Sequence, residues 1–150
     1  REVPRALALR LARAKAAAVT DPGFVLAADT VVAVGRRILP KPEDEGAARA
    51  CLTLLSGRRH RVLTAVVVRA PDGRRAERLA ESAVTFARLS GRQIAAYLAS
   101  GEWRGKAGGY AIQGLAAAHI RALGGSYSGV VGLPLFETAQ LLRGLGYPLP

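Results

Sequence analysis

The sequence predicts an α/β fold in which a mixed, twisted sheet is flanked by helices. Segments with apolar residues at helical spacing alternate with runs rich in Val, Ile and Leu, and clusters of Gly, Pro and Asp separate them. This order is typical of helices packed on a sheet. With 150 residues, half of them hydrophobic, the chain suits one core, so we expect a single domain over 1–150.

The first expected element is a helix that runs to about Val19. Pro4 suits its first turn, and the segment 20–23 (Thr-Asp-Pro-Gly) breaks it. The residues expected to face the core recur at helical spacing: Leu7, Leu11, Ala14 and Ala18.

Strand patterns follow on either side of one acidic residue. The segments 24–28 and 30–34 are apolar and β-branched, so Asp29 is expected at the edge of a strand. Gly35 and Arg36 form a turn into a short strand, after which the acidic segment 42–45 begins a helix that closes at 56–57.

The middle of the chain predicts a long hairpin. The segment 60–70 contains three consecutive valines, which suits a central strand covered on both faces. Pro71, Asp72 and Gly73 are a turn signal, and 74–87 is expected to return as a strand.

The last third predicts two helices around one strand. Ser90 and Gln93 form a capping box before a helix that ends at Gly101. The segment 115–123 suits either a strand or a helix, and only its resemblance to a known family favours the strand; 124–129 is expected to be a flexible loop. Pro134 opens a final helix, whose expected inward residues are Leu135, Ala139, Leu142 and Leu145.

The charge balance favours an anionic partner. The formal net charge is +11, yet the arginines are scattered and aromatic residues make up only 5%, so a basic stripe interleaved with aromatics is missing. Nucleic acid and membrane are therefore not expected as partners. The single Cys51 excludes a disulfide framework and suits a buried position in a reducing, cytoplasmic compartment.

Four charged residues are candidates for one anionic site. A carboxylate within an apolar run, as at Asp29, is costly to bury without a compensating cation, metal or donor. A carboxylate that only ends a strand and caps its turn is the alternative. The chain has 22 basic residues but three lysines, Lys15, Lys41 and Lys106, whose compact ammonium groups suit phosphate oxygens.

Several collinear motifs together resemble the Maf family of nucleoside triphosphate pyrophosphatases, also called septum formation inhibitors. The resemblance implies a fold akin to inosine-triphosphate pyrophosphatases, with a cleft between two lobes. The motifs are Ala-Lys-Ala at 14–16, Ala-Asp-Thr-Val-Val at 28–32, Ile-Leu-Pro-Lys-Pro at 38–42, Leu-Ser-Gly-Arg-Arg-His-Arg-Val at 55–62, Val-Thr-Phe at 84–86, Gly-Lys-Ala-Gly-Gly-Tyr-Ala-Ile-Gln-Gly at 105–114 and Gly-Ser-Tyr-Ser-Gly-Val-Val-Gly-Leu-Pro-Leu-Phe-Glu-Thr at 125–138.

The resemblance also implies roles for individual residues. Asp29 is implied as the general base that activates water, or as a metal ligand, with Mg²⁺ or Mn²⁺ as the expected cofactor. Lys15, Lys41 and Lys106 are implied to neutralise the leaving pyrophosphate. Thr30 and Gln113 match positions linked to base selection, and the motif around Gln113 resembles the dTTP/UTP branch of the family.

One departure from the family bears on activity. The family begins with a strand and a Ser-x-Ser-Pro-Arg-Arg loop that grips the triphosphate, whereas this sequence begins at the helix that carries Lys15 and has no methionine. We therefore expect the first strand and the phosphate-binding segment to be missing, and triphosphate binding by these 150 residues to be weak. An open sheet edge would favour a homodimer.

Two other functions remain as alternatives. The chain could be a basic nucleic-acid-binding or partner-binding protein that restrains septum formation without catalysis, or a pyrophosphatase of the 7-methyl-GTP type. His60 and His119 are interpreted as structural, because neither is paired with a nucleophile in the sequence. Trp103 and Tyr110 could stack on a base or pack onto the body of the protein.

Overall fold

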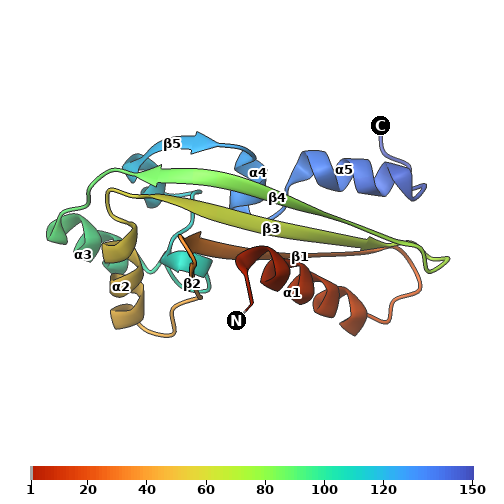
Figure 1. Cartoon of the computed structure of the whole chain (residues 1–150), viewed down its shortest axis with the longest axis horizontal. Coiled ribbons are helices and arrows are strands. Elements are labelled where there is room, and N and C mark those ends of the chain that lie inside the picture. Colours follow the sequence, from red (N-terminus) through yellow and green to blue (C-terminus); the bar gives the residue numbers. More distant parts are fainter. Residues whose placement is uncertain (1) are drawn as a thin grey trace. The chain divides into compact units, whose positions relative to one another are not determined.

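A five-stranded sheet with the strand order β2-β1-β3-β4-β5 is the framework of the computed structural model, which describes residues 2–150. The strands are β1 (Val25–Val34), β2 (Arg37–Leu39), β3 (Arg59–Arg69), β4 (Arg75–Phe86) and β5 (Ile120–Gly124). The arrows of neighbouring strands alternate in direction (Figure 1), and the β1–β2 and β4–β5 pairs are antiparallel. The α/β class with flanking helices is thus confirmed, with alternating strands in place of the mixed sheet expected.

The chain divides into two compact units, and β1, β3 and β4 each contribute residues to both. Unit 1 comprises 1–30, 63–81 and 126–150, and unit 2 comprises 31–62 and 82–125. No helix within residues 2–150 has the length and apolar character needed to cross a membrane.

Unit 1 contains the first helix, α1 (Pro4–Ala18), which packs through alanines. Its buried positions after Pro4 are Ala8, Ala12 and Ala16, each at most 2% exposed. The expected inward face, which included Leu7 and Leu11, was wrong. The buried stripe thus consists of small residues, whereas Leu7 and Leu11 are half-buried and Ala14 and Ala18 are exposed.

The last helix of unit 1, α5 (Leu135–Gly144), buries Thr138 and Leu141. Leu141 and Leu145 join a core cluster with Val66 and Val68 of β3. The expectation that Leu135 points inward was wrong, because this side chain is 60% exposed at the first turn.

A short helix, α4 (Tyr127–Val131), occupies the second half of the segment expected to be a flexible loop. Ser126 begins it, since its Oγ accepts a hydrogen bond from the backbone N–H of Gly129 at 2.9 Å. The Oγ of Ser128 accepts from the N–H of Leu135 at 2.9 Å, which joins α4 to the start of α5. The serines that suggested flexibility are thus capping groups.

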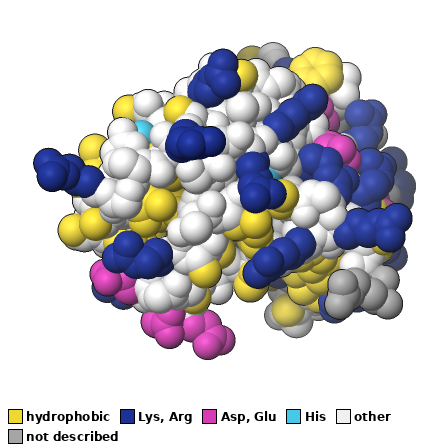
Figure 2. Space-filling view, turned by 60° about the vertical axis from the view of Figure 1, so that its left-hand side comes forward, with side chains coloured by type: hydrophobic (Ala, Val, Ile, Leu, Met, Phe, Trp, Pro, Cys, Tyr) yellow, Lys and Arg dark blue, Asp and Glu magenta, His cyan; other side chains and the backbone are white. Residues whose placement is uncertain are grey.

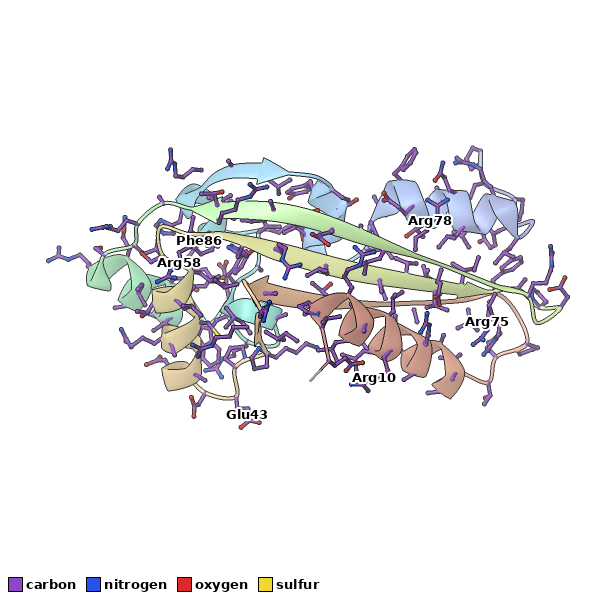
Figure 3. All side chains as sticks on the ribbon, in the orientation of Figure 1. Arg10, Glu43, Arg58, Arg75, Arg78 and Phe86 are labelled. Carbon is purple, nitrogen blue, oxygen red and sulfur yellow. The ribbon has the colours of Figure 1, made fainter. Side chains whose placement is uncertain are left out.

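Unit 2 contains two capped helices, α2 (Glu45–Leu55) and α3 (Gly91–Ser100). Asp44 caps α2 by accepting from the N–H of Ala47, and Ser90 forms the predicted capping box with Gln93. At the far end of the hairpin, the N–H of Phe86 donates to the carbonyl of Arg58 at 3.0 Å, and Figure 3 shows both residues at the neighbouring ends of β4 and β3.

The expected strand over 115–123 was correct only in its second half. Residues Leu115–His119 form a 3-10 helix, η2, and β5 follows. Three consecutive alanines carry no β-branching, so nothing local favours an extended backbone there. Gly114 begins the turn with a φ of 131°, a conformation that side chains disfavour.

Candidate active site

Asp29 lies within β1 among buried apolar residues of unit 1. The neighbours on its face of the strand, Ala27 and Val31, are 9% and 4% exposed, and the Asp29 side chain itself is 11% exposed. β1 is continuous through this residue, so the expectation of a strand edge at Asp29 was wrong. A carboxylate at this depth needs a partner to offset its desolvation.

That partner is Lys15, in the last turn of α1. Its Nζ lies 2.5 Å from Oδ1 of Asp29 and also donates to the carbonyl of Ala28 at 3.2 Å. The C-terminal end of a helix favours a cation. The Lys15 side chain is 52% exposed, which leaves the ammonium accessible to a second anion. Unit 1 therefore brings together two of the predicted site residues.

Thr30 follows Asp29 along β1, but its side chain contacts a different part of unit 1. Successive residues of a strand point to opposite faces of the sheet. The Oγ1 of Thr30 lies 2.9 Å from Oγ1 of Thr64, whose hydroxyl donates to the carbonyl of Gly129 at 2.7 Å. The structure thus places Asp29 toward α1 and Thr30 toward α4.

In unit 2, the segments that carry Lys41 and Lys106 are attached to each other. The N–H of Gly108 donates to the carbonyl of Pro40 at 3.3 Å, and both lysines are exposed. Gly108 has a φ of 74°, and a Cβ placed on it would meet Cγ1 of Val32 at 2.9 Å. Only glycine allows this approach, which fixes the Lys106 loop against β1.

Gln113 is exposed in a loop whose two sides are both anchored. The hydroxyl of Tyr97 accepts from the N–H of Ala111 at 3.1 Å, and Oε1 of Glu102 accepts from the N–H of Leu115 at 3.0 Å. These contacts hold the backbone around Gln113 and leave its amide exposed. An amide presented in this way can both donate and accept hydrogen bonds.

His60 supports the same region from β3. Its Nε2 is hydrogen-bonded to the hydroxyl of Tyr110 at 2.6 Å, and both rings pack edge-on against Phe86. Burial lowers the pKa of His60 to about 4 and raises the pKa of Tyr110. Both groups are therefore neutral at pH 7, and the structural interpretation of His60 is confirmed.

The remaining candidates of the sequence analysis also have structural roles. Trp103 is 3% exposed and donates from its indole N–H to the carbonyl of Leu98, so it packs onto the body of unit 2. Cys51 is buried as expected, and burial raises the pKa of its thiol. His119 is half-buried at the end of η2.

Comparison with known proteins shows the family of the chain. The family model described as "Maf-like protein" matches residues 1–145. The chain belongs to the Maf family. Relatives named "dTTP/UTP pyrophosphatase" include proteins from Granulibacter bethesdensis (72% identity, 93% of this chain and 66% of the relative), Gluconobacter oxydans (68% identity, 95% and 69%) and Maricaulis maris (63% identity, 99% and 72%). The chain therefore spans about two thirds of the length of these curated relatives.

A Maf-family nucleotide pyrophosphatase implies a divalent cation, so the donor groups of this chain bear on where one would bind. Within residues 2–150 there is no cluster of three or more His, Cys, Asp or Glu side chains that could hold a metal ion. Mg²⁺ in nucleotide enzymes is usually held by one or two carboxylates together with substrate phosphates. The single carboxylate of Asp29 fits an ion of that kind, one that is shared with the substrate.

The Lys and Arg side chains are unevenly spread over the face of this Maf chain that Figure 2 shows. Over the left and centre of Figure 2, Lys and Arg side chains stand apart with uncharged atoms between them. Several arginines of α1 are also paired with carboxylates, among them Arg10 with Glu2 and Arg13 with Glu77; Arg10 is labelled on α1 in Figure 3. On the right of Figure 2, Lys and Arg side chains lie closer together.

Sequence reasoning missed one residue of this site, Thr64. The signal was present, because a single hydroxyl interrupts the apolar run of 62–68 in the way that Asp29 interrupts 24–34. A polar side chain in a strand that is otherwise buried usually has a specific hydrogen-bond partner. Thr64 is 0% exposed and has two partners.

Proposed function

We propose that this member of the Maf family hydrolyses dTTP and UTP to the nucleoside monophosphate and pyrophosphate. The observation that carries the proposal is the Lys15–Asp29 ion pair at 2.5 Å, which keeps a carboxylate within an apolar strand. Buried, ion-paired carboxylates are candidates for general bases. The names of relatives that are 63–72% identical supply the substrate class.

In the proposed reaction, Asp29 accepts a proton from water as the water oxygen attacks the α-phosphorus. The bond from that phosphorus to the bridging oxygen breaks, and the electron pair leaves with pyrophosphate. Lys15, Lys41 and Lys106 stabilise the negative charge that develops on this leaving group. A positioned general base contributes roughly 10²–10⁴-fold to such a step.

Thr30 and Gln113 are proposed to select the base. A uracil or thymine edge carries both carbonyl oxygens and an imide N–H, so it needs a donor and an acceptor from the protein. The exposed amide of Gln113 offers both. Thr30 contributes a hydroxyl oxygen from the other face of β1.

Asp29 is also proposed as the protein ligand of a divalent cation, Mg²⁺ or Mn²⁺, that binds together with the triphosphate. When bound, such an ion would neutralise charge on the phosphate oxygens. Lys15 would hold the carboxylate of Asp29 in place, because its Nζ already lies 2.5 Å from Oδ1 of Asp29.

The direct test is pyrophosphate release by the purified protein, measured over a panel of dTTP, UTP, CTP, GTP, ATP and 7-methyl-GTP with Mg²⁺ or Mn²⁺. We expect dTTP and UTP to be hydrolysed fastest and EDTA to abolish turnover. Preference for 7-methyl-GTP would replace the proposed substrate class. Binding without pyrophosphate release from any nucleotide would contradict an enzymatic role and favour a binding protein.

A further inference from the structure

Three oxygen atoms of unit 1 form a short hydrogen-bonded chain between β1, β3 and α4. The Oγ1 of Thr30 lies 2.9 Å from Oγ1 of Thr64, and Oγ1 of Thr64 lies 2.7 Å from the carbonyl oxygen of Gly129. Thr64, in the middle, is 0% exposed, whereas Thr30 at the end is only half-buried. The buried part of the chain therefore leads to Thr30, a residue that is partly exposed.

The direction of these hydrogen bonds follows from the number of protons. A carbonyl oxygen only accepts, so the bond to Gly129 uses the one proton of Thr64. Thr64 must then accept in its other bond, and the proton of Thr30 is donated to it. The hydroxyl of Thr30 is left with lone pairs alone and can only accept a hydrogen bond from a ligand.

The backbone of Gly129 is fixed, which keeps its carbonyl in place to accept the proton of Thr64. Its N–H donates to Oγ of Ser126 at 2.9 Å as part of the cap of α4. A Cβ added at Gly129 would meet the same Oγ at 3.0 Å, so the backbone and the serine are in close contact. Turning the Thr64 proton away would leave a buried hydrogen bond to Gly129 unmade, which is unfavourable.

We propose that Thr64 is a positioning residue that turns Thr30 into a pure acceptor and thereby selects uracil and thymine against cytosine. The inference rests on the proposed function, in which Thr30 contacts the base. Position N3 of uracil and thymine carries a proton that an acceptor can bind, whereas N3 of cytosine is itself an acceptor. Two lone pairs facing each other reject the wrong base in the way that an unmatched buried polar group does.

The expected discrimination is about 10- to 100-fold in kcat/KM for UTP over CTP, the range that one unmatched polar contact provides. Thr64→Val keeps the shape of the side chain but removes the acceptor for the Thr30 proton. Thr30 can then rotate and donate to cytosine, so we expect the UTP/CTP ratio to fall by about tenfold. Thr64→Ser retains the hydroxyl and should restore the ratio.

The matched control is Thr53→Val, the same change at an exposed position of α2; it should leave the ratio as in the unsubstituted protein. Thr30→Val offers a second route if Thr64→Val does not fold. This variant removes the acceptor itself at a half-buried position and should lower kcat/KM for UTP much more than for CTP. General destabilisation would lower both values together and leave their ratio unchanged.

The outcomes separate the two proposals. Hydrolysis of UTP with an unchanged UTP/CTP ratio in Thr64→Val or in Thr30→Val overturns the inference and leaves the proposed function intact. Because weak triphosphate binding is expected, the assay uses saturating UTP. Failure of the unsubstituted protein to release pyrophosphate under that condition overturns the proposed function, and the inference with it. A ratio that falls in Thr64→Val and recovers in Thr64→Ser supports the inference.

Discussion

The ammonium of Lys15 and the carboxylate of Asp29 form an ion pair at 2.5 Å between the last turn of α1 and the middle of β1. The carboxylate is nearly buried and the ammonium is half exposed. A triphosphate that approaches Lys15 therefore approaches Asp29 as well. Neutralising Asp29 should therefore affect the chemical step while Lys15 remains available to the triphosphate.

We expect Asp29→Asn to lower turnover at least about 100-fold with little change in nucleotide affinity or in the free energy of unfolding. The amide cannot accept the proton of water, yet it costs less to bury than a carboxylate. Pyrophosphate release and urea unfolding measure the two effects. Asp21→Asn, at an exposed turn, is the matched control. Turnover within a few-fold of the unsubstituted protein would remove Asp29 from the mechanism.

Gln113→Glu tests base selection. The substitution removes the amide donor while keeping the size of the side chain, so transition-state stabilisation for dTTP and UTP should weaken by about 1–3 kcal/mol. Other triphosphates should lose much less. Gln140→Glu, exposed on α5, controls for the added charge. A uniform loss over the nucleotide panel would mean that Gln113 only holds its loop.

His60 should make the protein less stable as the pH falls below neutrality. Its pKa is about 4 in the folded protein against 6.5 when unfolded. Between these values only the unfolded state binds a proton at His60. The free energy of unfolding is therefore highest above pH 6.5 and decreases as the pH falls to about 4. The full difference of 2.5 pKa units corresponds to about 3 kcal/mol.

Urea unfolding at pH 7, 5.5 and 4.5 measures this slope. His60→Gln removes the titrating group and can still pair with the hydroxyl of Tyr110, so its stability should depend less on pH over this range. His119→Gln, at a half-buried position, should keep the slope of the unsubstituted protein. Equal slopes in the two variants would show that another group is responsible.

Gly108→Ala should destabilise the protein by about 2 kcal/mol or more. Left-handed backbone costs a residue with a side chain roughly 1–2 kcal/mol, and the new Cβ also meets Val32 at 2.9 Å. Gly105→Ala provides a matched comparison, because Gly105 has a φ of 70° with nothing within 4 Å. The difference between the two melting temperatures isolates the contact with Val32. If both variants have the same melting temperature, the contact of the new Cβ with Val32 does not affect stability.

The parts of the fold with local signals were predictable. The start of α1 at Pro4, the capping box at Ser90 and the hairpin turn at 71–73 each depend on residues adjacent in sequence. Lys15 and Asp29 were predicted as separate candidate residues. Their ion pair was not predicted, because this contact depends on how α1 packs on β1.

Features that depend on packing could not be predicted from local patterns. The buried face of α1 is made of alanines, and Leu7 and Leu11 are only half-buried. Leu135, in the first turn of α5, is 60% exposed, whereas Thr138 and Leu141 farther along the helix are buried. Thr64 became recognisable as part of the site only when Thr30 and Gly129 were seen on either side of it.

The opposite orientations of Asp29 and Thr30 constrain how a single molecule can contact both. Within the described residues, β2 pairs only with Val32–Val34 of β1. Residues 25–31 of β1 therefore have no neighbouring strand on the β2 side of the sheet. We expect a nucleotide that contacts both side chains to pass this edge of β1 and to shield its backbone amides from solvent. Hydrogen–deuterium exchange over 25–31 should therefore slow when UTP is bound, even in Asp29→Asn, which is expected to turn the substrate over only slowly.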